Sequence, residues 1–153
     1  MKSNKGFTLI ELLAVIVILA IIALIASPII IGLIDDARKG AAANSAYGVY
    51  HAVENVYAKL LLSSKSGLPD KVIYTFEDNG SVTIGYGEVG TTIKPEGWDM
   101  DEDDLVLKYN GTKPTGGVLT LNKDSSVDVI SPLIINGFTC SRTDNEFECQ
   151  NNQ

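Results

Sequence analysis

The sequence contains few of the residues that build metal centres and nucleophilic catalytic sites. Among 153 residues there are two cysteines, Cys140 and Cys149, and one histidine, His51. His51 has no second histidine, cysteine or acidic cluster near it in sequence, so we do not expect it to bind a metal or to act as a base. The chain also has no glycine-rich phosphate-binding loop. We therefore predict a protein that is not an enzyme and that needs no cofactor.

Positive charge is scarce outside the N-terminus. The formal net charge is −7, but residues 1–34 hold two lysines and one glutamate, so residues 35–153 carry −8. Nucleic acids and anionic membrane surfaces are polyanions, so neither is an expected partner of this acidic part. We expect it to be a hydrated domain with one modest core.

Apolar residues, in contrast, form a long uncharged run at Leu12–Ile34. A helix of these 23 residues would be about 34 Å long, enough to cross a bilayer core of about 30 Å. A cleaved secretory signal has a shorter apolar region, and the cleavage sequence before Ser27 is a poor match. A buried core helix is the other alternative, but apolarity on all faces of the helix favours lipid or a multi-helix bundle. Because Lys2 and Lys5 precede the run, we predict a single-pass helix in the cytoplasmic membrane, with the N-terminus inside.

One carboxylate, Glu11, stands just before this run. The surrounding stretch, Lys5-Gly6-Phe7-Thr8-Leu9-Ile10-Glu11-Leu12, resembles the processing signature of type IV pilins and their pseudopilin relatives. In that family a prepilin peptidase cuts a short basic leader after a glycine. The new N-terminal residue, usually phenylalanine, is N-methylated, and a glutamate lies fifth in the mature chain. Gly6, Phe7 and Glu11 match these positions, and Pro28 matches a proline in the family's apolar helix.

The resemblance implies roles for these residues. Residues 1–6 would be the leader, cleavage would fall between Gly6 and Phe7, and Phe7 would be N-methylated. Glu11 would lie on the same helix face as the new amine of Phe7. In the family, this glutamate pairs with an N-terminal amine, commonly a neighbour's. Because an unpaired charge in an apolar core is costly, the pair would also set the axial register. The alternative is that Glu11 pairs with no amine and that its carboxylate only reaches to the lipid headgroups.

Pro28 removes a backbone donor from the helix. We expect the helix to kink there or to loosen upstream. In related filaments the segment before this proline can lose its helical structure on assembly, which here would be about residues 21–28. An ordinary membrane-helix proline is the alternative.

Beyond the uncharged run the helix is expected to continue. Apolar residues recur at alternating spacings of three and four, as one stripe made of Ala46, Val49, Val53, Val56 and Leu60. We predict one helix from Thr8 to Leu62. Residues 7–34 would lie in the membrane or the filament core, and residues 35–62 would pack on a sheet.

From residue 63 to residue 153 the helical pattern is replaced by short β-rich runs. Strands are predicted at Val72–Phe76, Val82–Tyr86, Leu105–Tyr109, Val118–Leu121, Val127–Ile130, Leu133–Ile135, Phe138–Ser141 and Phe147–Gln150. Asn79-Gly80 between the first two is a strong hairpin signal. Because no helix intervenes, the sheet is expected to be antiparallel. The predicted fold is therefore α+β, a long helix packed by its second half on an antiparallel sheet, as the resemblance also implies.

The two cysteines fit a terminal hairpin. If Arg142 faces Phe147 across a four-residue turn, Cys140 lies opposite Cys149, and an external location allows a disulfide. The family often carries a disulfide near its C-terminus. Two free thiols remain the alternative.

The acidic stretch 99–104 invites comparison with a calcium loop. Some pseudopilins do bind calcium, but the glycine and glutamate of an EF-hand are missing from their positions here. A solvated acidic loop is the preferred interpretation, and we predict no metal site.

These observations predict a structural protein, a type IV pilin that polymerises through its N-terminal helix into a surface filament. The partners would be other copies of the chain, the prepilin peptidase and the pilus assembly platform. A pseudopilin of a type II secretion or DNA-uptake machine is the first alternative. A single-pass membrane receptor that binds a ligand without polymerising is the second.

Overall fold

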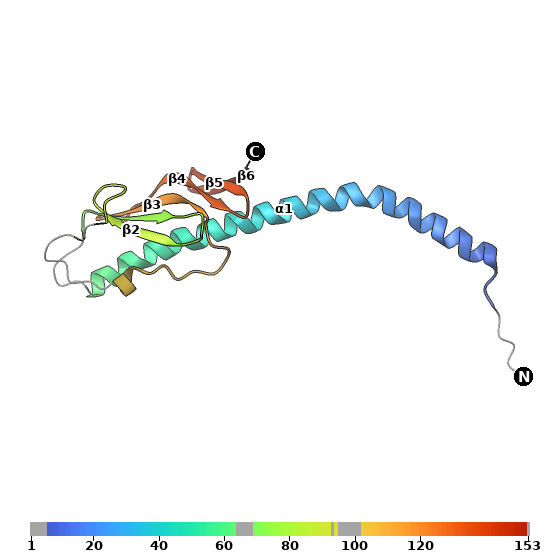
Figure 1. Ribbon diagram of the computed structural model, residues 1–153, viewed down its shortest axis with the longest axis horizontal. Helices are drawn as coiled ribbons and strands as arrows, with labels where there is room; N and C mark the ends of the chain where they lie inside the picture. Colours follow the sequence, from blue (N-terminus) through green and yellow to red (C-terminus); the bar gives the residue numbers. More distant parts are fainter. Residues whose placement is uncertain (1–5, 64–68, 93, 95–101, 153) are drawn as a thin grey trace, which may run out of the picture. The chain divides into compact units, whose positions relative to one another are not determined.

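The computed structural model describes residues 6–63, 69–92, 94 and 102–152. The chain divides into two compact units, residues 1–37 and residues 38–153. The helix α1 runs through both of them, and the sheet belongs to the second unit (Figure 1).

Helix α1 spans Leu9–Ser63, 55 residues, in agreement with the predicted helix. Within the second unit, the predicted apolar stripe is buried. Its five members are at most 1% exposed: Ala46, Val49, Val53, Val56 and Leu60. Ala42, one turn earlier in α1, is also fully buried. Full burial of a valine or leucine side chain contributes about 1.5–3 kcal/mol to the stability of the fold. This stripe is therefore the main attachment of α1 to the sheet.

The sheet has six strands in the order β2-β1-β3-β4-β5-β6, and each neighbouring pair is antiparallel. The strands are β1 (Lys71–Phe76), β2 (Val82–Tyr86), β3 (Gly116–Asn122), β4 (Val127–Ile135), β5 (Phe138–Thr143) and β6 (Glu146–Asn151). In Figure 1 the sheet lies along the second half of α1, and residues of both form one core cluster. The α+β fold predicted from the sequence is therefore confirmed.

The prediction of two separate strands at Val127–Ile130 and Leu133–Ile135 is wrong. They form the single strand β4, which continues through Pro132. Proline cannot donate to a ladder, so a strand accepts it at an irregularity. The partner strand β3 has a bulge there, where the register shifts between Gly116 and Val118. Gly117 has a φ of 119°, and a Cβ on it would lie 2.7 Å from the carbonyl oxygen of Pro132.

The strand predicted at Leu105–Tyr109 is also wrong. A short 3₁₀ helix, η1 (Glu102–Leu105), is followed by an extended segment that runs beside α1 (Figure 1). Leu105 is 1% exposed, and its carbonyl accepts a 3.2 Å hydrogen bond from the buried Tyr74 hydroxyl. Burial raises the pKa of Tyr74 far above its ordinary value, so this donor stays protonated. The apolar alternation that suggested a strand reflects packing of alternate side chains on the core.

This extended segment approaches α1 very closely at two glycines. Ser45 of α1 accepts the backbone N–H of Thr112 at 3.1 Å through its hydroxyl. A Cβ on Gly111, where φ is 124°, would lie 2.7 Å from the hydroxyl oxygen of Ser45. A Cβ on Gly48 would lie 2.9 Å from the carbonyl oxygen of Asn110. The two glycines therefore allow backbone and helix to touch here.

We predict that Gly48→Ala destabilises the second unit, although alanine is the better helix former. The new Cβ would meet the Asn110 backbone at 2.9 Å, and overpacking of this kind costs about 1–3 kcal/mol. Gly40→Ala is the matched control because a Cβ there meets nothing within 4 Å. It should raise the free energy of unfolding by about 1 kcal/mol. Urea denaturation of the full chain in detergent micelles measures the free energy of unfolding of each variant. If the two substitutions stabilise the protein equally, the close approach of Asn110 to Gly48 is contradicted.

Candidate assembly and processing site

The predicted cleavage site lies in the non-helical residues that lead into α1. Gly6, Phe7 and Thr8 precede the helix, and the Phe7 side chain is 92% exposed. A Cβ built on Gly6 would meet nothing within 4 Å. The fold itself therefore places no demand for glycine at this position.

Thr8 and Glu11 close the first turn of α1 with a reciprocal pair of hydrogen bonds. The Thr8 backbone N–H and hydroxyl each donate to Oε2 of Glu11 at 2.8 Å, and the Glu11 N–H donates to the Thr8 hydroxyl at 3.4 Å. This arrangement is a capping box. The negative carboxylate of Glu11 also interacts favourably with the positive end of the helix dipole. Within the described residues, Oε1 of Glu11 accepts no hydrogen bond. One carboxylate oxygen thus serves the helix terminus, and the other is left for a further donor.

The apolar part of α1 has no protein cover within its own unit. Every leucine, isoleucine and valine from Leu9 to Ile34 is exposed, with exposed fractions between 45% and 84%. By length and composition, α1 is the one helix in the described part of the chain that could cross a membrane. Contiguous exposed apolar surface of this kind marks a membrane or protein interaction site. The helix and its motif thus fit membrane anchoring.

Pro28 lies inside α1 without ending it. The proline has no N–H to offer the carbonyl of Leu24, so this carbonyl lacks its helical donor. The neighbouring Ser27 hydroxyl donates to the Ala23 carbonyl at 2.9 Å. The helix therefore continues through a turn that has one backbone hydrogen bond fewer than the rest.

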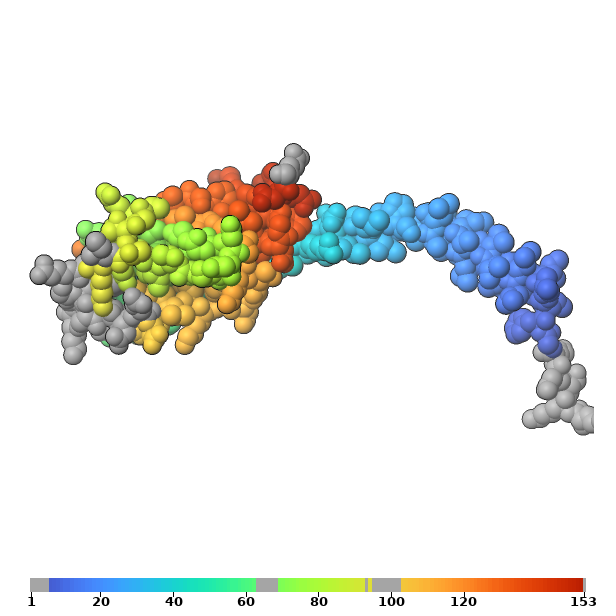
Figure 2. Space-filling model, viewed as in Figure 1, coloured from blue at the N-terminus to red at the C-terminus, as the bar shows by residue number. Residues whose placement is uncertain are grey.

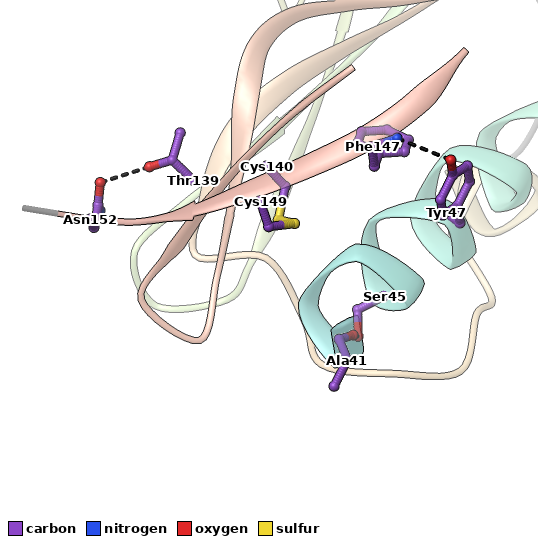
Figure 3. Close-up of a disulfide and its surroundings, with 8 residues drawn as sticks. All are labelled: Ala41, Ser45, Tyr47, Thr139, Cys140, Phe147, Cys149 and Asn152. Atoms are coloured by element: carbon purple, nitrogen blue, oxygen red, sulfur yellow. Dashed lines mark hydrogen bonds between the residues drawn. A yellow bond between two sulfur atoms is a disulfide. The ribbon is translucent and has the colours of Figure 1, made fainter. Parts of the chain in front are cut away.

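The two cysteines form the predicted disulfide in the β5–β6 hairpin (Figure 3). The register pairs Arg142 with Phe147 and Cys140 with Cys149, as the sequence predicted. Both half-cystines are at most 1% exposed and belong to the core cluster that includes the stripe of α1. The disulfide thus closes the hairpin on its helix-facing side.

Side chains of α1 hold this hairpin by contacts that sequence reasoning missed. The Tyr47 hydroxyl accepts the Phe147 backbone N–H at 3.0 Å, and their rings meet edge to face with centroids 5.1 Å apart (Figure 3). The Arg142 guanidinium lies 4.0 Å from the centre of the Tyr50 ring, and the Tyr50 hydroxyl donates to the Val127 carbonyl. These contacts join residues 77 to 100 positions apart, so no local pattern could reveal them.

The structure describes two further features of the sequence, His51 and part of the acidic stretch. His51 lies on the exposed side of α1, where Nδ1 is 2.7 Å from the Glu54 carboxylate. Residues 99–101 of the acidic stretch lie outside the described residues, and residues 102–105 form η1. Among the residues that the structure describes, no group of three or more His, Cys, Asp or Glu side chains could hold a metal ion.

We predict that loss of the disulfide destabilises the second unit without affecting α1 in the first. Closing a loop of nine residues is worth about 2–3 kcal/mol in the chain-entropy model. Reduction should add about 2 Da and increase proteolysis within β5 and β6. The variant with both Cys140→Ser and Cys149→Ser is the control, because reduction should not change its stability further. Two thiols that are alkylated freely in native, unreduced protein would contradict the disulfide.

Comparison with known proteins identifies the N-terminal region. Residues 1–27 match the prokaryotic N-terminal methylation motif. No curated protein and no solved structure matches the chain. The matched residues contain the predicted cleavage site, the capping box and most of the exposed apolar helix. The chain therefore carries the N-terminal signature of type IV prepilins on a pilin-like α+β fold.

Proposed function

We propose that this chain is a structural, non-enzymatic subunit of a type IV pilus. In this proposal a prepilin peptidase removes residues 1–6 and the Phe7 amine is methylated. Residues 7–34 then pass from the cytoplasmic membrane into the core of a surface filament. Residues 35–62 and 63–153 form the folded part that the filament displays. Adhesion, motility or aggregation would be the task of the filament.

One observation carries the proposal, namely that the methylation motif leads directly into a helix whose apolar residues are exposed on all sides. Eighteen leucine, isoleucine and valine side chains between residues 9 and 34 need cover. A bilayer covers them before assembly, and the same helices of neighbouring copies can cover them afterwards. A receptor that stays in the membrane would need the helix but would have no use for the cleavage motif.

The carboxylate of Glu11 supports a pairing between copies. Its Oε2 accepts both hydrogen bonds from Thr8, so Oε1 can accept a bond from the methylated amine of a neighbour. A buried carboxylate is tolerated when it is paired and hydrogen-bonded. Pro28, which leaves one backbone carbonyl unpaired, is the position where we propose that the helix adapts during assembly.

Electron microscopy of sheared surface material, labelled with antibody against this chain, tests the proposal as a whole. Long labelled filaments are the expected result. Short fibres that stay with the envelope would instead indicate a pseudopilin of a secretion or DNA-uptake machine. Label that stays in the membrane, with no fibre of any length, would overturn the proposal in favour of a receptor.

We predict that Gly6→Val blocks processing and leaves a precursor in the membrane without filaments. Because a Cβ at Gly6 meets nothing within the fold, the defect would come from the peptidase and not from misfolding. Intact-mass analysis of the membrane-held protein measures the retained leader. The wild-type chain should show a methyl group of about 14 Da on Phe7. Normal cleavage of the variant would refute the assigned site.

We predict that Glu11→Val is inserted into the membrane but enters filaments poorly. The substitution removes a charge from an apolar segment, so insertion should be as good or better. It also leaves the Phe7 amine of a neighbour without its partner. Glu11→Gln is the sharper variant, because an amide can still close the capping box with Thr8 but carries no charge.

The ratio of sheared to membrane-held subunit, with each variant as the sole copy, measures assembly. Both variants should give a ratio well below that of the wild type. If Glu11→Gln assembles normally while Glu11→Val does not, Glu11 acts through the helix cap alone. A wild-type ratio for both variants would mean that Glu11 is a carboxylate at the membrane interface without a role in assembly.

A further inference from the structure

The extended segment after η1 borders a surface hollow in the second unit. The segment, gold in Figure 2, forms part of the surface of this unit. The hollow has a volume of about 460 Å³ and is lined by Leu107, Lys108, Tyr109, Asn110, Gly111 and Lys113. All six residues come from one short stretch of chain, which the contacts of Gly48 and Ser45 hold against α1. The hollow therefore has a fixed wall.

Three polar side chains at this hollow have no partner among the residues that the structure describes. Among the described residues, Lys108, Lys113 and Asn110 form no ion pair and no side-chain hydrogen bond, whereas Lys123 pairs with Asp70 at 3.3 Å. These two ammonium groups place positive charge side by side in a part of the chain, residues 35–153, that carries a formal net charge of −8. Their donors remain available for a ligand with negative charge.

The wall of the hollow is apolar and partly aromatic. Leu107 and Tyr109 are half-buried and pack on the core cluster. Burial raises the pKa of the Tyr109 phenol, so it stays neutral and does not repel an anion. The same two residues and Lys113 also line a second hollow of about 290 Å³, which reaches the β1–β2 hairpin at Gly80 and Ser81. The two hollows share these three lining residues, so they are neighbours along the segment.

We propose that these two hollows form a binding site for an acidic saccharide, a short chain of sugars that carry carboxylates. Lys108 and Lys113 would bind the carboxylates, the Asn110 amide would bind hydroxyls, and Tyr109 with Leu107 would contact the apolar face of a sugar ring. An inorganic anion could use the lysines but not the apolar wall. A nucleic acid is a long polyanion and would extend beyond the two lysines, where the formal net charge of −8 on residues 35–153 would repel it.

The test uses the full chain in nonionic detergent micelles at low salt. The probe is digalacturonate, and digalactose, which has the same rings without carboxylates, is its neutral counterpart. Calorimetric titration or saturation-transfer NMR should detect digalacturonate, with at least about tenfold weaker binding of digalactose. Equal binding of both disaccharides, or no binding of digalacturonate, would overturn the proposal.

A pair of double variants separates the site from general electrostatics. Lys108→Gln with Lys113→Gln should weaken binding of digalacturonate at least about tenfold. Lys71→Gln with Lys123→Gln makes the same change in net charge away from the two hollows and should weaken it less than twofold. Equal loss in both double variants would overturn the proposal, because attraction would then depend on net charge alone.

Two competitors distinguish the class of ligand. Inorganic phosphate at equal charge should displace digalacturonate poorly, since it cannot contact Tyr109 and Leu107. A short single-stranded DNA should bind more weakly than digalacturonate. Efficient displacement by phosphate would reduce the site to a simple anion site, and tighter binding of DNA would replace the saccharide by a nucleic acid; either result contradicts the proposal.

Discussion

The apolar surface of α1 is the constraint on which the rest of the structure depends. One helix of 55 residues has two kinds of apolar surface. In the second unit the apolar residues form a single stripe, and the sheet covers it. In the first unit they occupy all sides of the helix, and no element of the unit covers them. The first half must therefore find its cover outside the chain, and the proposed function follows from this requirement together with the methylation motif.

The sequence predicts the features that local patterns determine. The spacing of Ala46 to Leu60 gives the buried face of α1, and Asn79-Gly80 gives the first hairpin. The distance between Cys140 and Cys149, set by a four-residue turn, gives the register of the last hairpin. Thr8 and Glu11 have the spacing of a capping box, which the pattern of threonine and glutamate three residues apart could have revealed.

The features that the sequence does not predict depend on partners far away in the chain. Leu105–Tyr109 alternates like a strand, but the surface on which it packs includes α1 and Tyr74. Periodicity reports which side chains are buried and is silent about what covers them. Val127–Ile130 and Leu133–Ile135 were predicted as two strands, whereas a bulge at Gly117 in the neighbouring strand lets β4 continue through Pro132. The contact between Tyr47 and Phe147 likewise appears only once the chain has folded.

The strand order has a consequence for the proposed filament, in which many copies would lie side by side. β2 and β6 are the two edges of the sheet, and an exposed edge invites pairing with the edge of another molecule. On β6 the Phe147 N–H is already bonded to Tyr47, and Glu146 and Glu148 are exposed acidic residues. On β2 the Tyr86 N–H is bonded to the Thr91 carbonyl of the following loop. A side chain, a loop and acidic charge thus protect both edges against β-aggregation. In the proposed filament, copies would then associate through their helices while their sheets stay separate.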